Sequence, residues 1–299
     1  MIADISGPTL CSGIARPNGT FAMLANDQRE TLRTLLTQAG KGATDDDLRS
    51  FKRAVAQHIS PVASALLVDR VYGLAAVSTP GVVAPGCGLI VAVDNLIQPP
   101  GEAVQSTTLE TGAMGSELVG AGARALKFLT IWRPGDGGGG RDQTMPAFVE
   151  GCHRLGLAAV AEAIVRVPGD DEDALDEAIL RAAQEMGSYG PDVYKAQVPT
   201  LGRGSPDKIE RLSRELTGAA GCPWVVLSSG VPQDRFPAAV EAACRGGASG
   251  FLAGRGIWAA SIAAKDTVDD LKNAAVQRFE HLVAIADACA RPWFEAIRT

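Results

Sequence analysis

The stretch P-D-V-Y-K-A-Q-V-P, residues 191–199, has the pattern of a short buried β-strand that ends at a proline. Lys195 stands in its middle, with valine and tyrosine before it and alanine after it. A buried ammonium group is costly unless it is paired or gives up its proton. The stretch therefore predicts a core strand that carries a lysine with a special role.

Seven further apolar runs of similar length lie along the chain, at residues 21–27, 65–70, 88–94, 125–132, 158–165, 224–230 and 250–256. Near-continuous apolar runs are typical of strands buried on both faces, and helical patterns separate most of them. This alternation over 299 residues predicts an α/β fold, a (β/α)8 TIM barrel. We expect one domain over residues 1–299 with a long C-terminal helix from about 267 to 290.

A doubly wound sheet is the alternative fold, but no G-x-G-x-x-G motif follows the first run. The segment G-D-G-G-G-G, residues 135–140, follows the fourth run and lacks the lysine and serine of a phosphate-binding loop. It is interpreted as a flexible loop, with a lid over the site as the alternative.

Composition excludes several classes of function. The net charge of −6 disfavours non-specific nucleic-acid binding, and no apolar run approaches the ~18 residues of a membrane span. The N-terminus lacks the features of a signal peptide, so we expect a cytoplasmic protein. The three histidines fall in predicted helices, which gives no support to a metal site or a Ser-His-Asp triad.

Three of the apolar runs carry a charge in their middle, namely Lys127, Glu162 and Lys195, and Asp27 ends the first run. Such residues are rarely buried unless they are paired, and in a barrel they would meet at the mouth. A structural ion pair is one interpretation. The other is catalytic. Because two lysines outnumber one glutamate, like charge would push one lysine toward the neutral amine, which forms Schiff bases with carbonyls.

The last two runs end in S-S-G, residues 228–230, and A-G-R-G, residues 253–256. Loops after the seventh and eighth barrel strands often bind phosphate through backbone amides, although ordinary turns would have the same composition. The predicted anion site consists of Ser228, Ser229, Gly230, Gly254 and Arg255. Arg133 and Arg166 follow the fourth and fifth runs, where they are either surface residues or ligands of a second anionic group.

Several of these segments resemble the sulfofructosephosphate aldolases, which are grouped with the class I tagatose-bisphosphate aldolases. The resemblance runs from about Gly19 to the final helix and is carried by F-A-M-L-A-N-D-Q-R-E (21–30), A-L-K-F-L-T-I-W-R (125–133), D-V-Y-K-A-Q-V-P (192–199), P-W-V-V-L-S-S-G-V (223–231) and G-A-S-G-F-L-A-G-R-G-I-W (247–258). It implies metal-free and cofactor-free cleavage of 6-deoxy-6-sulfofructose 1-phosphate into dihydroxyacetone phosphate and 3-sulfolactaldehyde.

The resemblance also implies roles for individual residues. The Schiff-base lysine of the family falls on Lys195, its strand-four lysine on Lys127 and its strand-five acid on Glu162. Asp27 and Gln28 are expected to orient substrate hydroxyls. The chain departs from the family at Gln197, where an acid is common, and in the A-I-V-R-V-P segment after Glu162.

Three alternatives remain open at this stage. Tagatose 1,6-bisphosphate is the alternative substrate, a non-catalytic sugar-phosphate-binding barrel is the alternative from another class, and a metal-dependent aldolase is disfavoured because the predicted rim lacks histidine. We expect a small sugar phosphate or sulfonate as the only ligand, with neither nucleic acid nor membrane as a partner. Barrel aldolases are commonly oligomers, so a homodimer or homotetramer is expected.

Overall fold

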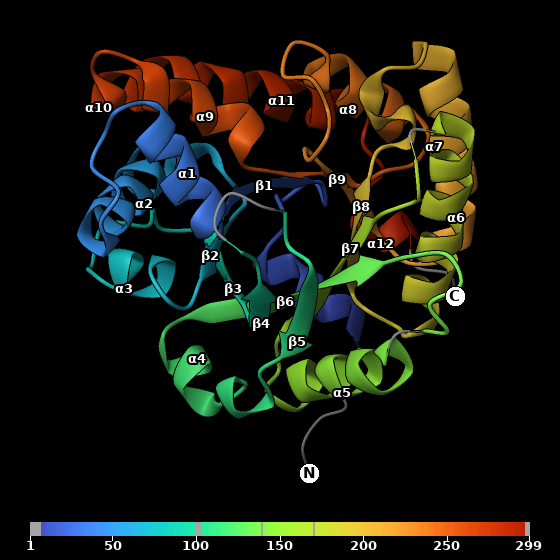
Figure 1. The fold of residues 1–299 in the computed structure, drawn as a ribbon. Helices are drawn as coiled ribbons and strands as arrows, with labels where there is room; N and C mark the ends of the chain where they lie inside the picture. Colours follow the sequence, from blue (N-terminus) through green and yellow to red (C-terminus); the bar gives the residue numbers. More distant parts are fainter. Residues whose placement is uncertain (1–6, 100–102, 139, 170, 297–299) are drawn as a thin grey trace.

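Eight parallel strands close into a barrel in the computed structural model, which describes residues 7–99, 103–138, 140–169 and 171–296 (Figure 1). The order of the strands around the barrel is β1-β10-β9-β8-β7-β6-β3-β2. Their bounds are β1 Phe21–Asn26, β2 Ala65–Asp69, β3 Gly88–Ala92, β6 Ala123–Trp132, β7 Ala158–Val165, β8 Val193–Gln197, β9 Trp224–Leu227 and β10 Gly250–Ala253. The prediction of a TIM barrel is confirmed.

Each of the eight apolar runs coincides with a barrel strand, although β6 begins two residues before its run and six of the strands end one to three residues earlier than predicted. Polar residues that the sequence pattern placed at strand ends therefore lie just beyond them, at the carboxyl-terminal mouth of the barrel. Below the mouth, alternate strand residues fill the barrel interior with small and medium apolar side chains, such as Met23, Leu67, Val160, Val193 and Leu252.

Helices cover the outside of the barrel (Figure 1). They are α1 Glu30–Gln38, α2 Asp45–Ile59, α3 Gly73–Val77, α4 Ser116–Gly120, α5 Arg141–Arg154, α6 Glu172–Ser188, α7 Pro206–Ala220, α8 Phe236–Arg245, α9 Arg255–Ala263, α10 Thr267–Asp270, α11 Val276–Cys289 and α12 Trp293–Ala296. Side-chain caps explain several starts: Thr44 and Asp47 form a capping box on α2, and Ser205 caps α7. None of the described helices is both long and apolar enough to cross a membrane.

The C-terminal helix is not uniform. Where the sequence predicted one helix over 267–290, α10 and α11 are joined by a π-helical turn, Leu271–Ala275. Leu271 and Ala275 are buried within this turn. The wider turn keeps the segment continuous while it packs beside α2 and α9.

A two-stranded antiparallel sheet, β4 Asp94–Ile97 and β5 Ser106–Leu109, was not predicted. It leaves the barrel directly after β3 and stands at the mouth (Figure 1). The segment G-D-G-G-G-G precedes α5, and Asp136 within it pairs with Arg141 at 2.7 Å. This ion pair closes the loop onto α5, while Gly139 lies outside the described residues.

A buried ion pair lies beside the first two strands. Lys52 of α2 and Asp69 at the end of β2 are both fully buried, with Nζ and Oδ2 2.7 Å apart. Lys52 Nζ also donates to the carbonyl oxygen of Asn26 at 2.6 Å, while Asp69 accepts from the backbone N–H groups of Tyr72 and Gly73. Burial lowers the pKa of Lys52, and Asp69 partly offsets this effect. The pair ties α2 to the ends of β1 and β2.

Closure of the barrel between β1 and β10 depends on Gly250. Its φ is +135°, and a Cβ at this position would lie 1.9 Å from the carbonyl oxygen of Phe21. We expect Gly250→Ala to lower the free energy of unfolding by at least about 2 kcal/mol, because neither backbone can move without opening the barrel. Urea denaturation would measure the loss.

Gly218→Ala is the matched control. Gly218 lies in α7, and nothing lies within 4 Å of where its Cβ would be. Alanine is the better helix former, so this variant should gain up to about 1 kcal/mol. Equal urea midpoints for the two variants would contradict the close-approach argument.

Candidate active site

A cavity of about 400 Å³ lies at the mouth of the barrel. Its wall includes Leu96 of β4 and Gln98, which directly follows β4. The β4–β5 sheet therefore forms one side of the cavity. Ten of the twelve sequence-predicted site residues line it, namely Asp27, Gln28, Lys127, Glu162, Arg166, Lys195, Ser228, Ser229, Gly254 and Arg255. Gly230 lines a smaller adjoining cavity together with Ser228 and Arg255, and Arg133 does not line the main cavity.

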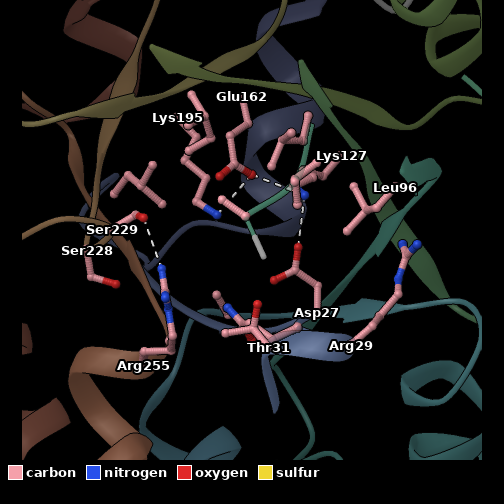
Figure 2. A pocket seen from close by; sticks show the side chains of 18 of the residues that line it. Asp27, Arg29, Thr31, Leu96, Lys127, Glu162, Lys195, Ser228, Ser229 and Arg255 are labelled. Carbon is pink, nitrogen blue, oxygen red and sulfur yellow. Dashed lines mark hydrogen bonds and ion pairs between the residues drawn. The ribbon is translucent and has the colours of Figure 1, made fainter. Parts of the chain in front are cut away.

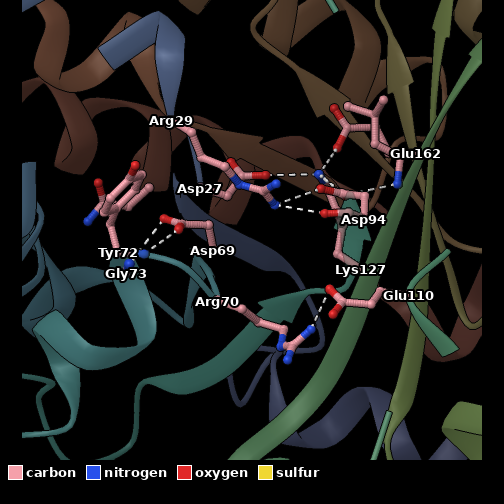
Figure 3. Close-up of polar contacts among 12 residues, drawn as sticks. Asp27, Arg29, Asp69, Arg70, Tyr72, Gly73, Asp94, Glu110, Lys127 and Glu162 are labelled. Carbon is pink, nitrogen blue, oxygen red and sulfur yellow. Dashed lines mark hydrogen bonds and ion pairs between the residues drawn. The ribbon is translucent and has the colours of Figure 1, made fainter. Parts of the chain in front are cut away.

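Lys127 is held by three carboxylates. Its Nζ lies 2.9 Å from Asp27 Oδ2, 2.9 Å from Asp94 Oδ2 and 3.1 Å from Glu162 Oε2 (Figure 3). Burial disfavours the ammonium form, but the three negative charges outweigh it and raise the pKa of Lys127 well above its usual value. Lys127 is therefore a fixed cation in the centre of the site.

Glu162 stands between the two lysines. The same oxygen, Oε2, lies 3.1 Å from Lys195 Nζ and 3.1 Å from Lys127 Nζ (Figure 2). The parallel register pairs Glu162 of β7 with Lys195 of β8, which brings these side chains together on neighbouring strands. Both are buried, with exposures of 3% for Glu162 and 2% for Lys195.

The expectation that lysines outnumber acids in this cluster is wrong. Three carboxylates, from Asp27, Asp94 and Glu162, accompany two lysines. Burial alone would raise the pKa of Asp27, but Lys127 and then Lys195 reverse the effect and hold that pKa well below its usual value. Asp27 is thus a permanent carboxylate, while the buried Oε1 of the adjacent Gln28 has no partner among the described residues.

Asp94 and Arg29 are the residues that sequence reasoning missed. Asp94 Oδ2 accepts from Lys127 and from the backbone N–H of Leu129, at 2.9 and 3.2 Å. Arg29 donates to the carbonyl oxygen and to Oδ1 of Asp94, at 2.9 and 3.0 Å (Figure 3). The signal for Asp94 was present, because it ends the third apolar run as Asp27 ends the first.

One side of the cavity is suited to an anion. Arg255 donates to Ser229 Oγ at 2.9 Å, and both lie to one side of the lysines in Figure 2. Arg255 begins α9, whose start carries no side-chain cap, so its first backbone N–H groups are available to a ligand. A Cβ at Gly254 would lie 2.5 Å from the carbonyl oxygen of Ala25, so glycine permits this close approach of loop and strand.

A second cationic side chain, Arg166, lies at the cavity three strands around the barrel from Arg255. Arg166 directly follows β7 and lines the cavity, whereas Arg255 lies two residues after the end of β10. In the part of the chain that the structure describes, no group forms a hydrogen bond or ion pair with the Arg166 side chain. Arg133 is exposed instead and donates to the carbonyl oxygen of Gln105 at 3.2 Å.

Comparison with solved structures supports the fold. A fructose-bisphosphate aldolase from Plasmodium falciparum, solved in complex with TRAP and a small-molecule inhibitor, superposes with a TM-score of 0.71. The alignment covers 95% of this chain and 94% of that one at 16% identity, so it bears on the fold alone.

Curated relatives match along nearly the whole chain. A protein of Listeria monocytogenes (strain HCC23) named tagatose 1,6-diphosphate aldolase is 25% identical, over 94% of this chain and 91% of the relative. The tagatose 1,6-diphosphate aldolase 1 of Streptococcus pyogenes serotype M3 (strain SSI-1) is 27% identical, over 93% of this chain and 95% of the relative. The model of the DeoC/LacD family aldolases matches residues 21–260, and the chain therefore belongs to the DeoC/LacD family of aldolases.

Proposed function

We propose that this aldolase cleaves 6-deoxy-6-sulfofructose 1-phosphate through a Schiff base on Lys195, giving dihydroxyacetone phosphate and 3-sulfolactaldehyde. The observation that carries the proposed chemistry is the single oxygen of Glu162 that contacts both Lys195 and Lys127 at 3.1 Å. This arrangement offers a nucleophile, a proton carrier and a fixed cation within one buried cluster.

In the first stage, Lys195 Nζ gives a proton to Glu162 and attacks the C2 carbonyl carbon of the ketose. The new N–C2 bond forms as Glu162 gives its proton to the carbonyl oxygen, and Glu162 then takes the second proton of the attacking nitrogen, which yields a neutral carbinolamine. Glu162 then donates a proton to the departing hydroxyl group, and loss of water leaves the iminium. Lys127 and Asp27 hold substrate hydroxyl groups during these steps.

In the second stage, Glu162 accepts the proton of the C4 hydroxyl group. The electrons of the C3–C4 bond move into the iminium as the bond breaks, so an aldehyde leaves and an enamine remains on Lys195. Protonation at C3 and hydrolysis release dihydroxyacetone phosphate and restore the lysine.

Three segments support the sulfosugar as substrate. The chain looks closer to the sulfosugar aldolases than to tagatose-bisphosphate aldolases in W-R at the end of β6, in V-R-V-P at the end of β7 and in A-S-G-F-L-A-G-R, residues 248–255, around β10. Tagatose 1,6-bisphosphate is the second candidate, because the curated relatives described above carry that name. Either substrate has an anion at each end, which suits a cavity with Arg255 and Arg166 in its wall.

Borohydride reduction tests the nucleophile. We expect treatment with dihydroxyacetone phosphate and borohydride to attach one three-carbon adduct, and peptide mass spectrometry to locate it on Lys195. Lys195→Ala should abolish both adduct and turnover while its circular dichroism spectrum stays that of the parent. An adduct on Lys127 instead would refute the assignment.

Glu162→Gln tests the proton carrier. The amide keeps the size of the side chain but cannot accept the proton, so kcat should fall by about 10²–10⁴-fold, the usual contribution of a general acid–base group. Steady-state cleavage assays measure this, with Glu150→Gln as a control because Glu150 is exposed on α5 and pairs with Arg154. A loss below threefold would show that another group carries the proton.

A comparison of kcat/KM separates the two substrates. We expect 6-deoxy-6-sulfofructose 1-phosphate to be cleaved with a kcat/KM at least about tenfold above those of tagatose 1,6-bisphosphate and fructose 1,6-bisphosphate, equivalent to about 1.4 kcal/mol of transition-state binding. The reverse preference would favour the tagatose-bisphosphate activity and leave the lysine chemistry unchanged.

A further inference from the structure

Gln197 is a buried polar side chain near the site that the mechanism does not use. It ends β8, two residues after Lys195, and is 7% exposed. Its Oε1 accepts a hydrogen bond from the backbone N–H of Val165, at 2.6 Å. The described β7–β8 register ends at Glu162 and Lys195, so the Gln197 side chain holds the last residue of β7 beyond the backbone pairing.

The residue held next to this bond is Arg166. On its other side, the Arg166 backbone N–H donates to the carbonyl oxygen of Trp132 at 2.9 Å, so β6 and β8 together fix the main chain where β7 ends. Burial and then the nearby Arg133 lower the pKa of Arg166, and no carboxylate counters them. Arg166 is thus a positioned cation at the cavity wall without a protein counter-ion among the described residues.

Lys195 lies between two loops that carry a cation, the loop with Arg166 and the loop with Arg255. Around the barrel, Arg166 follows β7, Lys195 lies on β8, Ser228 and Ser229 follow β9, and Arg255 follows β10. A ketose bound to Lys195 at C2 would therefore extend one end toward Ser229 and Arg255 and the other end toward Arg166.

We propose that Gln197 is a specificity-determining residue, whose neutral amide holds the end of β7 and leaves Arg166 free to bind the anionic group at the far end of the substrate. This inference rests on the proposed aldolase function. A glutamate would offer the same acceptor to Val165, but its second oxygen would bring a negative charge to Arg166. The substrate anion would then compete with an internal carboxylate.

Gln197→Glu is the direct test, because it changes the charge of the side chain while keeping its size and its acceptor oxygen. We expect KM for 6-deoxy-6-sulfofructose 1-phosphate, and for tagatose 1,6-bisphosphate, to rise at least about tenfold, with kcat within about threefold of the parent. Dihydroxyacetone phosphate has no second anion, so its concentration for half-maximal borohydride trapping on Lys195 should stay unchanged.

Three further variants make the result specific. Arg166→Gln should raise KM for the same substrates, and the double variant Arg166→Gln/Gln197→Glu should be no worse than Arg166→Gln alone, since both changes affect one interaction. Gln143→Glu adds a negative charge at an exposed site on α5 and should leave KM as it is.

The outcomes separate this inference from the proposed function. A parent protein that forms no adduct with dihydroxyacetone phosphate would overturn both. If the parent forms the adduct but Gln197→Glu leaves KM unchanged, the role of Gln197 is wrong and the aldolase function stands. If Gln197→Glu weakens dihydroxyacetone phosphate trapping as much as it raises KM, Gln197 acts on Lys195 and the inference is overturned.

Discussion

The ammonium group of Lys127 can stay charged inside the barrel only because three carboxylates surround it. Those carboxylates come from the end of β1, the start of β4 and the middle of β7, while Lys127 itself lies on β6. The cluster therefore assembles only when the barrel is closed. In turn, the buried ion pairs between Lys127 and these carboxylates stabilise the arrangement of the four segments.

The surroundings of this cluster strengthen its electrostatics. Below it, the barrel interior is filled by apolar residues such as Met23, Val160 and Val193, which lie on the same strand faces as the charged ones. Above it, β4 carries Leu96 over the cavity. Charges between apolar layers interact more strongly than they would in water, and this is the condition that acid–base chemistry and iminium formation require.

The sequence predicted the barrel because every core strand is an apolar run, and apolar runs are local. It also predicted Lys127, Glu162 and Lys195 as a group, since a charged residue inside such a run is rarely buried without an opposite charge beside it. Asp94 was missed although it ends the third apolar run; it begins β4 rather than ending a core strand, and the pairing of β3 with β6 brings it to Lys127. The β4–β5 sheet is short, and its inward face mixes polar with apolar residues, namely Asp94, Leu96, Thr107 and Leu109, so no hydrophobic pattern marked it.

Lys127 and Lys195 differ in how many carboxylates depend on their positive charge. If Lys127 lost its proton, Asp27 and Asp94 would both lose a cation that lies 2.9 Å away. If Lys195 loses its proton, Glu162 is still paired with Lys127 through the same oxygen, and no carboxylate is left alone. The shared oxygen thus makes the charge of Lys127 structural and that of Lys195 dispensable. A nucleophilic amine needs that freedom, so the geometry favours Lys195 as the residue that attacks the carbonyl carbon.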